Sequence, residues 1–130
     1  MQIVGIGIDV IEVERIDEAV EEFGDRFLER IFTEGEREYC GRQKRPAIHN
    51  AARWAAKEAV SKAFGTGIGA ELGWTDIEIV RRKSGEPELV LHGRAKEFAG
   101  EIGVREVKIS LTHAKHYAAA NAVVLVSEAE

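Results

Sequence analysis

A long alanine-rich segment, which begins at Pro46 and ends at Gly65, limits most strongly what this chain can fold into. Proline suits the first turn of a helix, and glycine suits the left-handed position that follows the last turn. At the helical period the small apolar residues share one stripe about 100° wide. The stripe consists of Ala52, Ala56, Ala59, Val60 and Ala63. Because these side chains are small, we expect the helix to pack closely against a sheet or another helix.

A second constraining segment is "IVGIGIDV", residues 3–10. Its Ile and Val residues alternate with Gly5, Gly7 and Asp9, and a period of two predicts a strand. One face of this strand therefore carries two glycines and a carboxylate. The residues leave two interpretations of Asp9 open: it forms a turn at the end of the strand, or it lies where a ligand can approach the backbone.

Short helices are predicted on both sides of the alanine-rich segment. Apolar residues at helical spacing, a glycine at position 24 and the capping-box spacing of Thr33 and Glu36 all support them. The expected helices cover residues 16–23, 27–31, about 34–40 and 94–102.

Two pairs of strands complete the expected fold. Residues 75–82 and 87–92 alternate around the turn-like "KSGE", which predicts an antiparallel hairpin. Residues 106–113 and 117–126 predict a second pair. Because strands and helices do not alternate regularly, we predict an α+β fold, in which an antiparallel sheet packs with the long alanine-rich helix and shorter helices.

Composition limits the domain count and the classes of function. A chain of 130 residues that is 45% hydrophobic suits a single domain, residues 1–130. Its 18 basic and 23 acidic residues give a net charge of −5, which offers no overall positive field for nucleic acid. No segment approaches the ~20 apolar residues of a membrane span. The single cysteine, Cys40, cannot form an internal disulfide, so we expect a reducing, cytoplasmic setting.

Glu58 and Lys62 lie one helical turn apart, away from the alanine stripe. This spacing supports a helix by roughly a few tenths of a kcal/mol, so a surface ion pair is one interpretation. The other is a binding site: if Asp9 and Glu58 meet in space, they offer hard oxygen ligands to Mg²⁺. Trp54 falls on the same side as Glu58, which suggests a site, a subunit interface or packing against another element.

The glycines that follow the long helix are Gly65, Gly67 and Gly69. They do not match the dinucleotide fingerprint, because they come after a helix instead of linking a strand to a helix. They predict either a helix cap with a flexible loop or a loop whose backbone N–H groups receive a ligand. His113, at the end of a predicted strand, is either a structural residue or part of a site, and the histidines and the cysteine lack zinc-ligand spacing.

Several cations cluster in the sequence. Lys44, Arg45 and Arg53 bracket the start of the long helix, and Arg26 and Arg30 lie one turn apart on an earlier one. Solvated helix faces are one explanation. The other is a local cationic patch that attracts an acidic partner to an acidic protein.

Three segments in this order, "GIGIDVIEVERI", "ARWAAKEAVSKAFGTGIG" and "ISLTHAKHYAAA", resemble the bacterial holo-acyl-carrier-protein synthases, a group of 4′-phosphopantetheinyl transferases. The resemblance runs from about Gly5 to Val124 and includes the G-x-D, K-E-x-x-x-K and S-x-T-H elements. It implies the 4′-phosphopantetheinyl transferase fold. It also implies transfer of the phosphopantetheine arm of coenzyme A to a serine of apo acyl carrier protein, in fatty acid biosynthesis, with release of adenosine 3′,5′-bisphosphate. Such a phosphoryl transfer depends on cations at the pyrophosphate and on an in-line nucleophile.

Carried over position by position, the resemblance implies a catalytic set of Asp9, Glu58 and Lys62. Asp9 and Glu58 would hold Mg²⁺, and Lys62 would neutralise or protonate the departing phosphate. The implied coenzyme-binding residues are Lys44, Arg45, Arg53, Gly65, Thr66, Gly67 and His113. The implied carrier-binding residues are Arg15, Arg26 and Arg30.

The resemblance further implies a homotrimer with active sites between neighbouring subunits, which would explain an outward Trp54. A cationic patch would explain how an acidic enzyme binds an acidic carrier protein. The alternative function is a non-catalytic oligomeric protein that binds coenzyme A or another nucleotide through the same cations and glycines. A weaker alternative is a structural module whose charges are all solvated.

Overall fold

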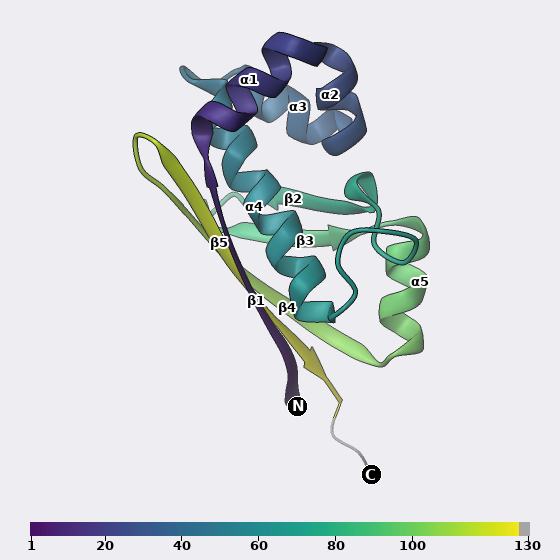
Figure 1. The fold of residues 1–130 in the computed structure, drawn as a ribbon. Coiled ribbons are helices and arrows are strands. Elements are labelled where there is room, and N and C mark those ends of the chain that lie inside the picture. The colour runs from purple at the N-terminus through teal and green to yellow at the C-terminus, as the bar shows by residue number, and fades with distance from the viewer. Residues whose placement is uncertain (128–130) are drawn as a thin grey trace.

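The computed structural model describes residues 1–127, in which a three-stranded antiparallel sheet packs against one long helix (Figure 1). The helices are α1 (Val13–Phe23), α2 (Asp25–Ile31), α3 (Glu34–Gly41), α4 (Pro46–Phe64), the 3-10 turn η1 (Trp74–Asp76) and α5 (Gly93–Glu101). The strands are β1 (Gln2–Glu12), β2 (Ile77–Arg81), β3 (Pro87–Leu91), β4 (Val104–His113) and β5 (Tyr117–Val126). The predicted α+β class is confirmed. Within the described range, none of the helices combines the length and the apolarity that a membrane crossing requires.

β5 lies in the centre of the sheet, with β1 on one side and β4 on the other. Its inward-facing residues Ala118, Ala120 and Ala122 are buried and pack with the alanines of α4. β2 and β3 form a separate antiparallel hairpin, as the sequence predicts. Small residues on both the sheet and the helix therefore bring the two layers close together.

The approach of β1 to α4 is closest at Gly5 and Gly7. A Cβ atom on Gly5 would lie 1.7 Å from the carbonyl oxygen of Ala63, and one on Gly7 would lie 1.9 Å from that of Ala59. No side chain fits in this space, so the main chain of β1 lies directly on the main chain of α4. Asp9 is on the same face of β1, so it lies beside the last turns of α4.

The helices α1, α2 and α3 cover the N-terminal half of α4 (Figure 1). Trp54 of α4 stacks on Phe27 of α2, with ring centroids 6.1 Å apart and planes 18° apart. The ring of Trp74 lies 4.5 Å from that of Trp54. Of the interpretations open for Trp54, the structure supports packing against another element of the same chain.

One expectation about local structure is wrong, and one feature was not predicted. Residues 75 and 76, expected in a strand, belong to η1, because the N–H of Asp76 bonds back to the carbonyl of Gly73 at 3.1 Å. The feature that was not predicted is the enclosure of α4. This helix is buried over most of its circumference, because the sheet covers one side and the short helices and η1 cover much of the other. Lys57 is consequently fully buried.

Candidate active site

Asp9 and Lys62 form an ion pair where β1 crosses α4. Lys62 Nζ donates to Asp9 Oδ1 at 2.9 Å and to the carbonyl oxygen of Ile8 at 3.0 Å. The Asp9 side chain is only 16% exposed, whereas that of Lys62 is 50% exposed. The carboxylate is therefore fixed by its surroundings, while the ammonium group remains accessible to a ligand.

Glu58 lies one turn before Lys62 and interacts with the charge of Asp9. Burial raises the pKa of Glu58 above its ordinary value, the negative charge of Asp9 raises it further, and Lys62 opposes both effects. The structure thus brings together the three residues of the predicted catalytic set. Two carboxylates that repel each other form a site that gains stability from a further cation.

The chemistry of this donor set suits Mg²⁺, which takes oxygen ligands and is commonly bound by one or two carboxylates together with substrate phosphates. Among residues 1–127, no group of three or more His, Cys, Asp or Glu side chains is arranged to hold a metal ion. An ion held by Asp9 and Glu58 would therefore draw its other ligands from water and substrate. That these two residues hold a metal stays a prediction.

A pocket of about 200 Å³ lies between α3, the N-terminal half of α4, the β2–β3 hairpin and the end of β4. Its polar lining consists of Tyr39, His49, Arg53, Arg81 and His113. The Arg53 guanidinium lies 4.3 Å from the centroid of the Tyr39 ring, and Arg81 Nη1 donates to Tyr39 Oη at 2.6 Å. The rings of His49 and His113 are 5.7 Å apart.

The pocket lining contains two arginines and two histidines but no carboxylate. Burial lowers the pKa of His49, and the charges of Arg53, His113 and Arg81 lower it further. Arg53 is 6% exposed, and its Nε has no hydrogen-bond partner. Because the lining combines two guanidinium groups with two histidines, this pocket favours an anionic ligand such as a phosphate group.

Of the predicted coenzyme-binding cations, Arg53 and His113 lie together in this pocket, whereas Lys44 and Arg45 do not line it. Both of the latter are exposed, and Arg45 Nη1 donates to the carbonyl oxygen of Lys115 at 2.9 Å. Sequence reasoning did not single out Tyr39, His49 or Arg81 as site residues. They come from α3, α4 and β2, and no local pattern links these three elements.

The glycine loop after α4 forms the predicted helix cap. Gly65 is left-handed, with φ 83°, and its N–H bonds to the carbonyl of Lys62. Thr66 Oγ1 donates to the carbonyl oxygen of Gly67 at 2.8 Å. At about 1.5 Å per residue the loop begins about 18 Å beyond Arg53 along the helix. Contact of the loop with adenosine stays a prediction.

The predicted carrier-binding residues lie apart from the pocket. Arg15 is exposed on α1, and Arg26 and Arg30 are exposed on α2. Both helices belong to the group that covers the N-terminal half of α4 (Figure 1). Their role in binding an acidic partner stays a prediction.

Comparison with known proteins gives a consistent result. The 4′-phosphopantetheinyl transferase superfamily matches residues 5–122 of the chain. The holo-[acyl-carrier-protein] synthase of Chlamydia trachomatis serovar L2 is 48% identical over 119 residues, which cover 92% of this chain and 97% of that protein.

Two solved structures are also similar. The holo-[acyl-carrier-protein] synthase of Neisseria meningitidis has a TM-score of 0.91 at 31% identity and covers 95% of this chain and 99% of its own. The synthase of Bacillus anthracis, solved in complex with CoA (3′,5′-ADP), has a TM-score of 0.80 at 40% identity and covers 98% of this chain and 100% of its own. The family match includes every predicted site residue, from Asp9 to His113.

Proposed function

Because the chain belongs to the 4′-phosphopantetheinyl transferase superfamily, we propose that it transfers the 4′-phosphopantetheine arm of coenzyme A to a serine hydroxyl of apo acyl carrier protein. The products are holo acyl carrier protein and adenosine 3′,5′-bisphosphate. The relatives described above are named for this carrier, and one of them binds coenzyme A. The observation that carries the proposal is the meeting of Asp9, Glu58 and Lys62 where β1 crosses α4.

The chain's own residues supply the charge that this reaction requires. A phosphoryl transfer leaves negative charge on the departing phosphate and needs positioned cations more than a covalent enzyme group. Lys62 Nζ, half exposed and oriented by Asp9, can bind a pyrophosphate oxygen or give it a proton. Arg53 and His113 suit a second phosphate group of the coenzyme in the pocket beside β4, at the other edge of the sheet from Asp9.

The proposal includes a Mg²⁺ ion held by Asp9 and Glu58. When bound, such an ion neutralises the oxygens of the pyrophosphate. Burial and the charge of Asp9 raise the pKa of Glu58, and this supports the assignment, because a nearby cation would offset both effects.

Incubation of the protein with coenzyme A, Mg²⁺ and an apo carrier protein is expected to increase the carrier's mass by one phosphopantetheine group, as measured by intact-protein mass spectrometry. Chelation with EDTA is expected to stop the reaction, and added Mg²⁺ to restore it. An unmodified carrier that a known holo synthase does modify would contradict the transfer and favour the non-catalytic binder. Modification that persists in EDTA would contradict only the metal.

The carrier protein and its setting are part of the same proposal. The exposed residues Arg15, Arg26 and Arg30 offer electrostatic complementarity to an acidic carrier of fatty acid biosynthesis.

We place the reaction in the cytoplasm. Cys40 is compatible with a reducing compartment, since it is a buried thiol whose pKa burial raises to about 11.

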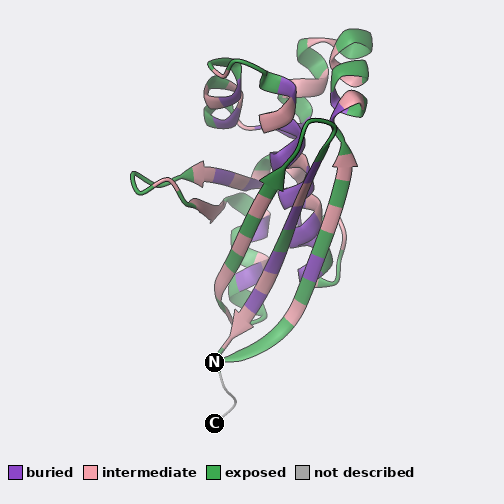
Figure 2. Ribbon diagram, turned by 90° about the vertical axis from the view of Figure 1, so that its left-hand side faces the viewer, coloured by how far each residue is buried: buried purple, intermediate pink, exposed green. Residues whose placement is uncertain are grey.

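We also propose a homotrimer, supported by the outer face of β1. Figure 2 looks onto the sheet from the side that α4 does not cover. There Ile6, Ile8 and Val10 are 68%, 70% and 64% exposed and form a contiguous apolar strip. Exposed apolar strips of this kind mark protein interfaces. Because β1 is an edge strand of the sheet and also carries Asp9, a neighbouring subunit here would lie near the catalytic residues.

Substitution of Ile8 by glutamate is expected to convert the trimer to monomers, because a carboxylate would be buried in the apolar strip. Light scattering coupled to size-exclusion chromatography measures the change. The matched control is Ile102→Glu, which alters an apolar side chain that is 44% exposed at the end of α5. A wild-type monomer, or an Ile8→Glu trimer, would contradict the assembly.

A further inference from the structure

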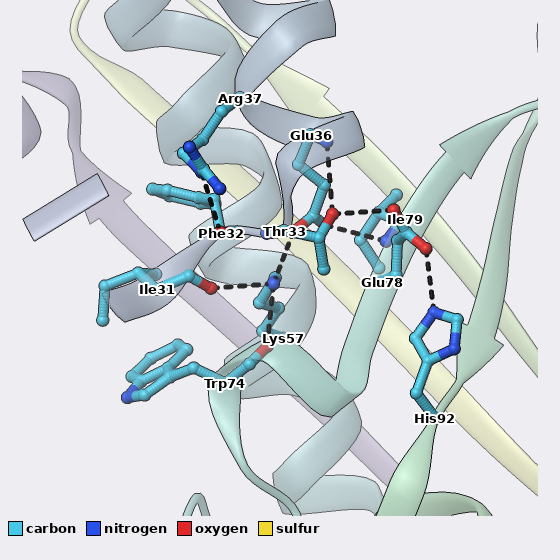
Figure 3. Close-up of polar contacts among 10 residues, drawn as sticks. All are labelled: Ile31, Phe32, Thr33, Glu36, Arg37, Lys57, Trp74, Glu78, Ile79 and His92. Carbon is cyan, nitrogen blue, oxygen red and sulfur yellow. Dashed lines mark hydrogen bonds and ion pairs between the residues drawn. The ribbon is translucent and has the colours of Figure 1, made fainter. Parts of the chain in front are cut away.

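Lys57 is the immediate neighbour of Glu58 on α4, yet its side chain is completely buried. Its Nζ donates to three acceptors: the carbonyl of Ile31 at 2.8 Å, Glu36 Oε1 at 2.6 Å and the carbonyl of Trp74 at 2.8 Å (Figure 3). An ammonium group has three N–H donors. All of them are used, and each goes to a different segment of the chain.

The carboxylate of Glu36 is equally enclosed. It is fully buried, and its Oε1 also accepts from the N–H of Thr33 at 2.9 Å, while Oε2 accepts from the N–H of Ile79 at 2.8 Å (Figure 3). Burial lowers the pKa of Lys57, and the charge of Glu36 opposes that change. The pair therefore joins α4 to the end of α2, the start of α3, η1 and β2.

A buried ion pair of this kind is weak evidence of stabilisation. Apolar residues of similar volume often stabilise a core as well or better, because both charges must be removed from water. The pair does fix geometry, because hydrogen bonds have preferred directions. The three N–H groups of Lys57 and the two carboxylate oxygens of Glu36 hold the main chains of several segments at defined positions. Its effect should therefore be sought in geometry as well as in stability.

The contact with Ile31 affects the position of α2, the helix that carries the proposed carrier-binding residues Arg26 and Arg30. Ile31 is the last residue of α2, so Lys57 places a cation on a terminal helix carbonyl, where the helix dipole favours positive charge. α2 starts after Gly24, a glycine with a positive φ of 61°. Besides the packing of Phe27 on Trp54, the end of α2 is held by Lys57. Arg30 lies one residue before this anchor.

We propose that Lys57 is a positioning residue, which fixes the carrier-docking helix α2 relative to the catalytic Glu58 beside it on α4. This inference rests on the proposed function, because it assigns α2 to the carrier protein. Lys57 does not touch substrate. It sets the distance between the surface that binds the carrier and the site that receives the carrier's serine.

The test uses the full-length protein with Lys57→Met and Glu36→Gln combined, which removes both charges and retains the volume. In a sample shown to be folded by circular dichroism, the KM for the carrier is expected to rise about tenfold, the factor that one hydrogen bond to a charged group represents. The KM for coenzyme A is expected to rise by a smaller factor, because Arg53 and Lys62 belong to α4 itself, although the pair also holds α3 and β2, which line the pocket. The control is Lys96→Met on α5, an exposed lysine whose loss should change neither constant.

A double-mutant cycle separates positioning from simple destabilisation. Arg30→Ala should raise the carrier KM in the wild-type background and have little further effect in the Lys57→Met/Glu36→Gln background, because Arg30 is already misplaced there. Additive effects, or an unchanged carrier KM in the folded variant, would overturn the proposal. If the combined variant does not fold, Lys57→Arg replaces it, because this change keeps the charge and shifts the N–H donors. The carrier KM is then measured in the Lys57→Arg background with and without Arg30→Ala. A wild-type protein that leaves the carrier unmodified would instead refute the proposed function.

Discussion

Replacement of Gly7 by alanine is expected to remove a large part of the free energy that stabilises the fold. The new Cβ would lie 1.9 Å from the carbonyl oxygen of Ala59 and 2.8 Å from the main-chain nitrogen of Ala63. Overpacked cores usually lose about 1–3 kcal/mol, because side chains can adjust. Here the obstacle is the backbone of a central helix. We therefore expect a loss above about 4 kcal/mol, a large part of the roughly 5–15 kcal/mol that stabilises a domain.

Denaturant unfolding followed by circular dichroism measures this effect. The matched control is Gly100→Ala in α5, where an added Cβ has no neighbour within 4 Å and the backbone is helical. This control should be as stable as the wild type or more stable by about 0.5–1 kcal/mol. A Gly7→Ala protein with the wild-type midpoint would show that β1 does not lie directly on α4.

Glu58→Gln is expected to lower kcat at least about a hundredfold, the effect typical of removing one group that stabilises a transition-state charge. Asp9→Asn should do the same, because it removes the other proposed metal ligand and the partner of Lys62. The rate of carrier modification measures both. Wild-type turnover in either variant would contradict the assignment of these two carboxylates.

Glu58→Gln should at the same time stabilise the fold at neutral pH. The pKa of Glu58 is raised in the folded protein, so the folded state holds this proton more tightly than the unfolded state. Stability is therefore lost as the pH rises from the unfolded pKa through the raised one. The amide removes this loss, so the melting temperature of the variant should exceed that of the wild type at pH 7 and approach it below about pH 4.

Glu101→Gln is the control with the opposite sign. Glu101 lies on α5, and its hydrogen bonds with Arg94 lower its pKa. Its loss should leave the activity unchanged and should not stabilise the protein at pH 7. If Glu58→Gln loses activity without gaining stability, the carboxylate is not under the electrostatic strain that the structure indicates.

Much of the fold could be predicted because its determinants are local. Pro46 and Gly65 bound α4 in the structure as they do in the sequence, and the capping box of Thr33 and Glu36 begins α3. Alternation in residues 3–10 placed the glycines and Asp9 on one face of a strand. That these glycines touch helix carbonyls could not be predicted, because the contact joins segments far apart in the chain.

The parts of the site that the sequence did not reveal depend on tertiary contacts. Glu58 and Lys62 have the spacing of an ordinary surface pair, and their assignment came from the resemblance. Lys57 is one residue away, yet nothing in its local pattern distinguishes a buried lysine from a solvated one. Only the enclosure of α4 by several elements does so. Tyr39 and Arg81 of the anion pocket likewise meet only after α3 and β2 have packed.

The aromatic stack between α2 and α4 has a practical consequence. The chain has two tryptophans, Trp54 and Trp74, and both lie in this stack, in which Trp54 packs on Phe27 of α2. Tryptophan fluorescence therefore comes from one place in the molecule, the contact between α4 and the proposed carrier-docking helix α2. If a carrier protein shifts α2 when it binds, the tryptophan fluorescence should change, so binding can be measured without an attached dye.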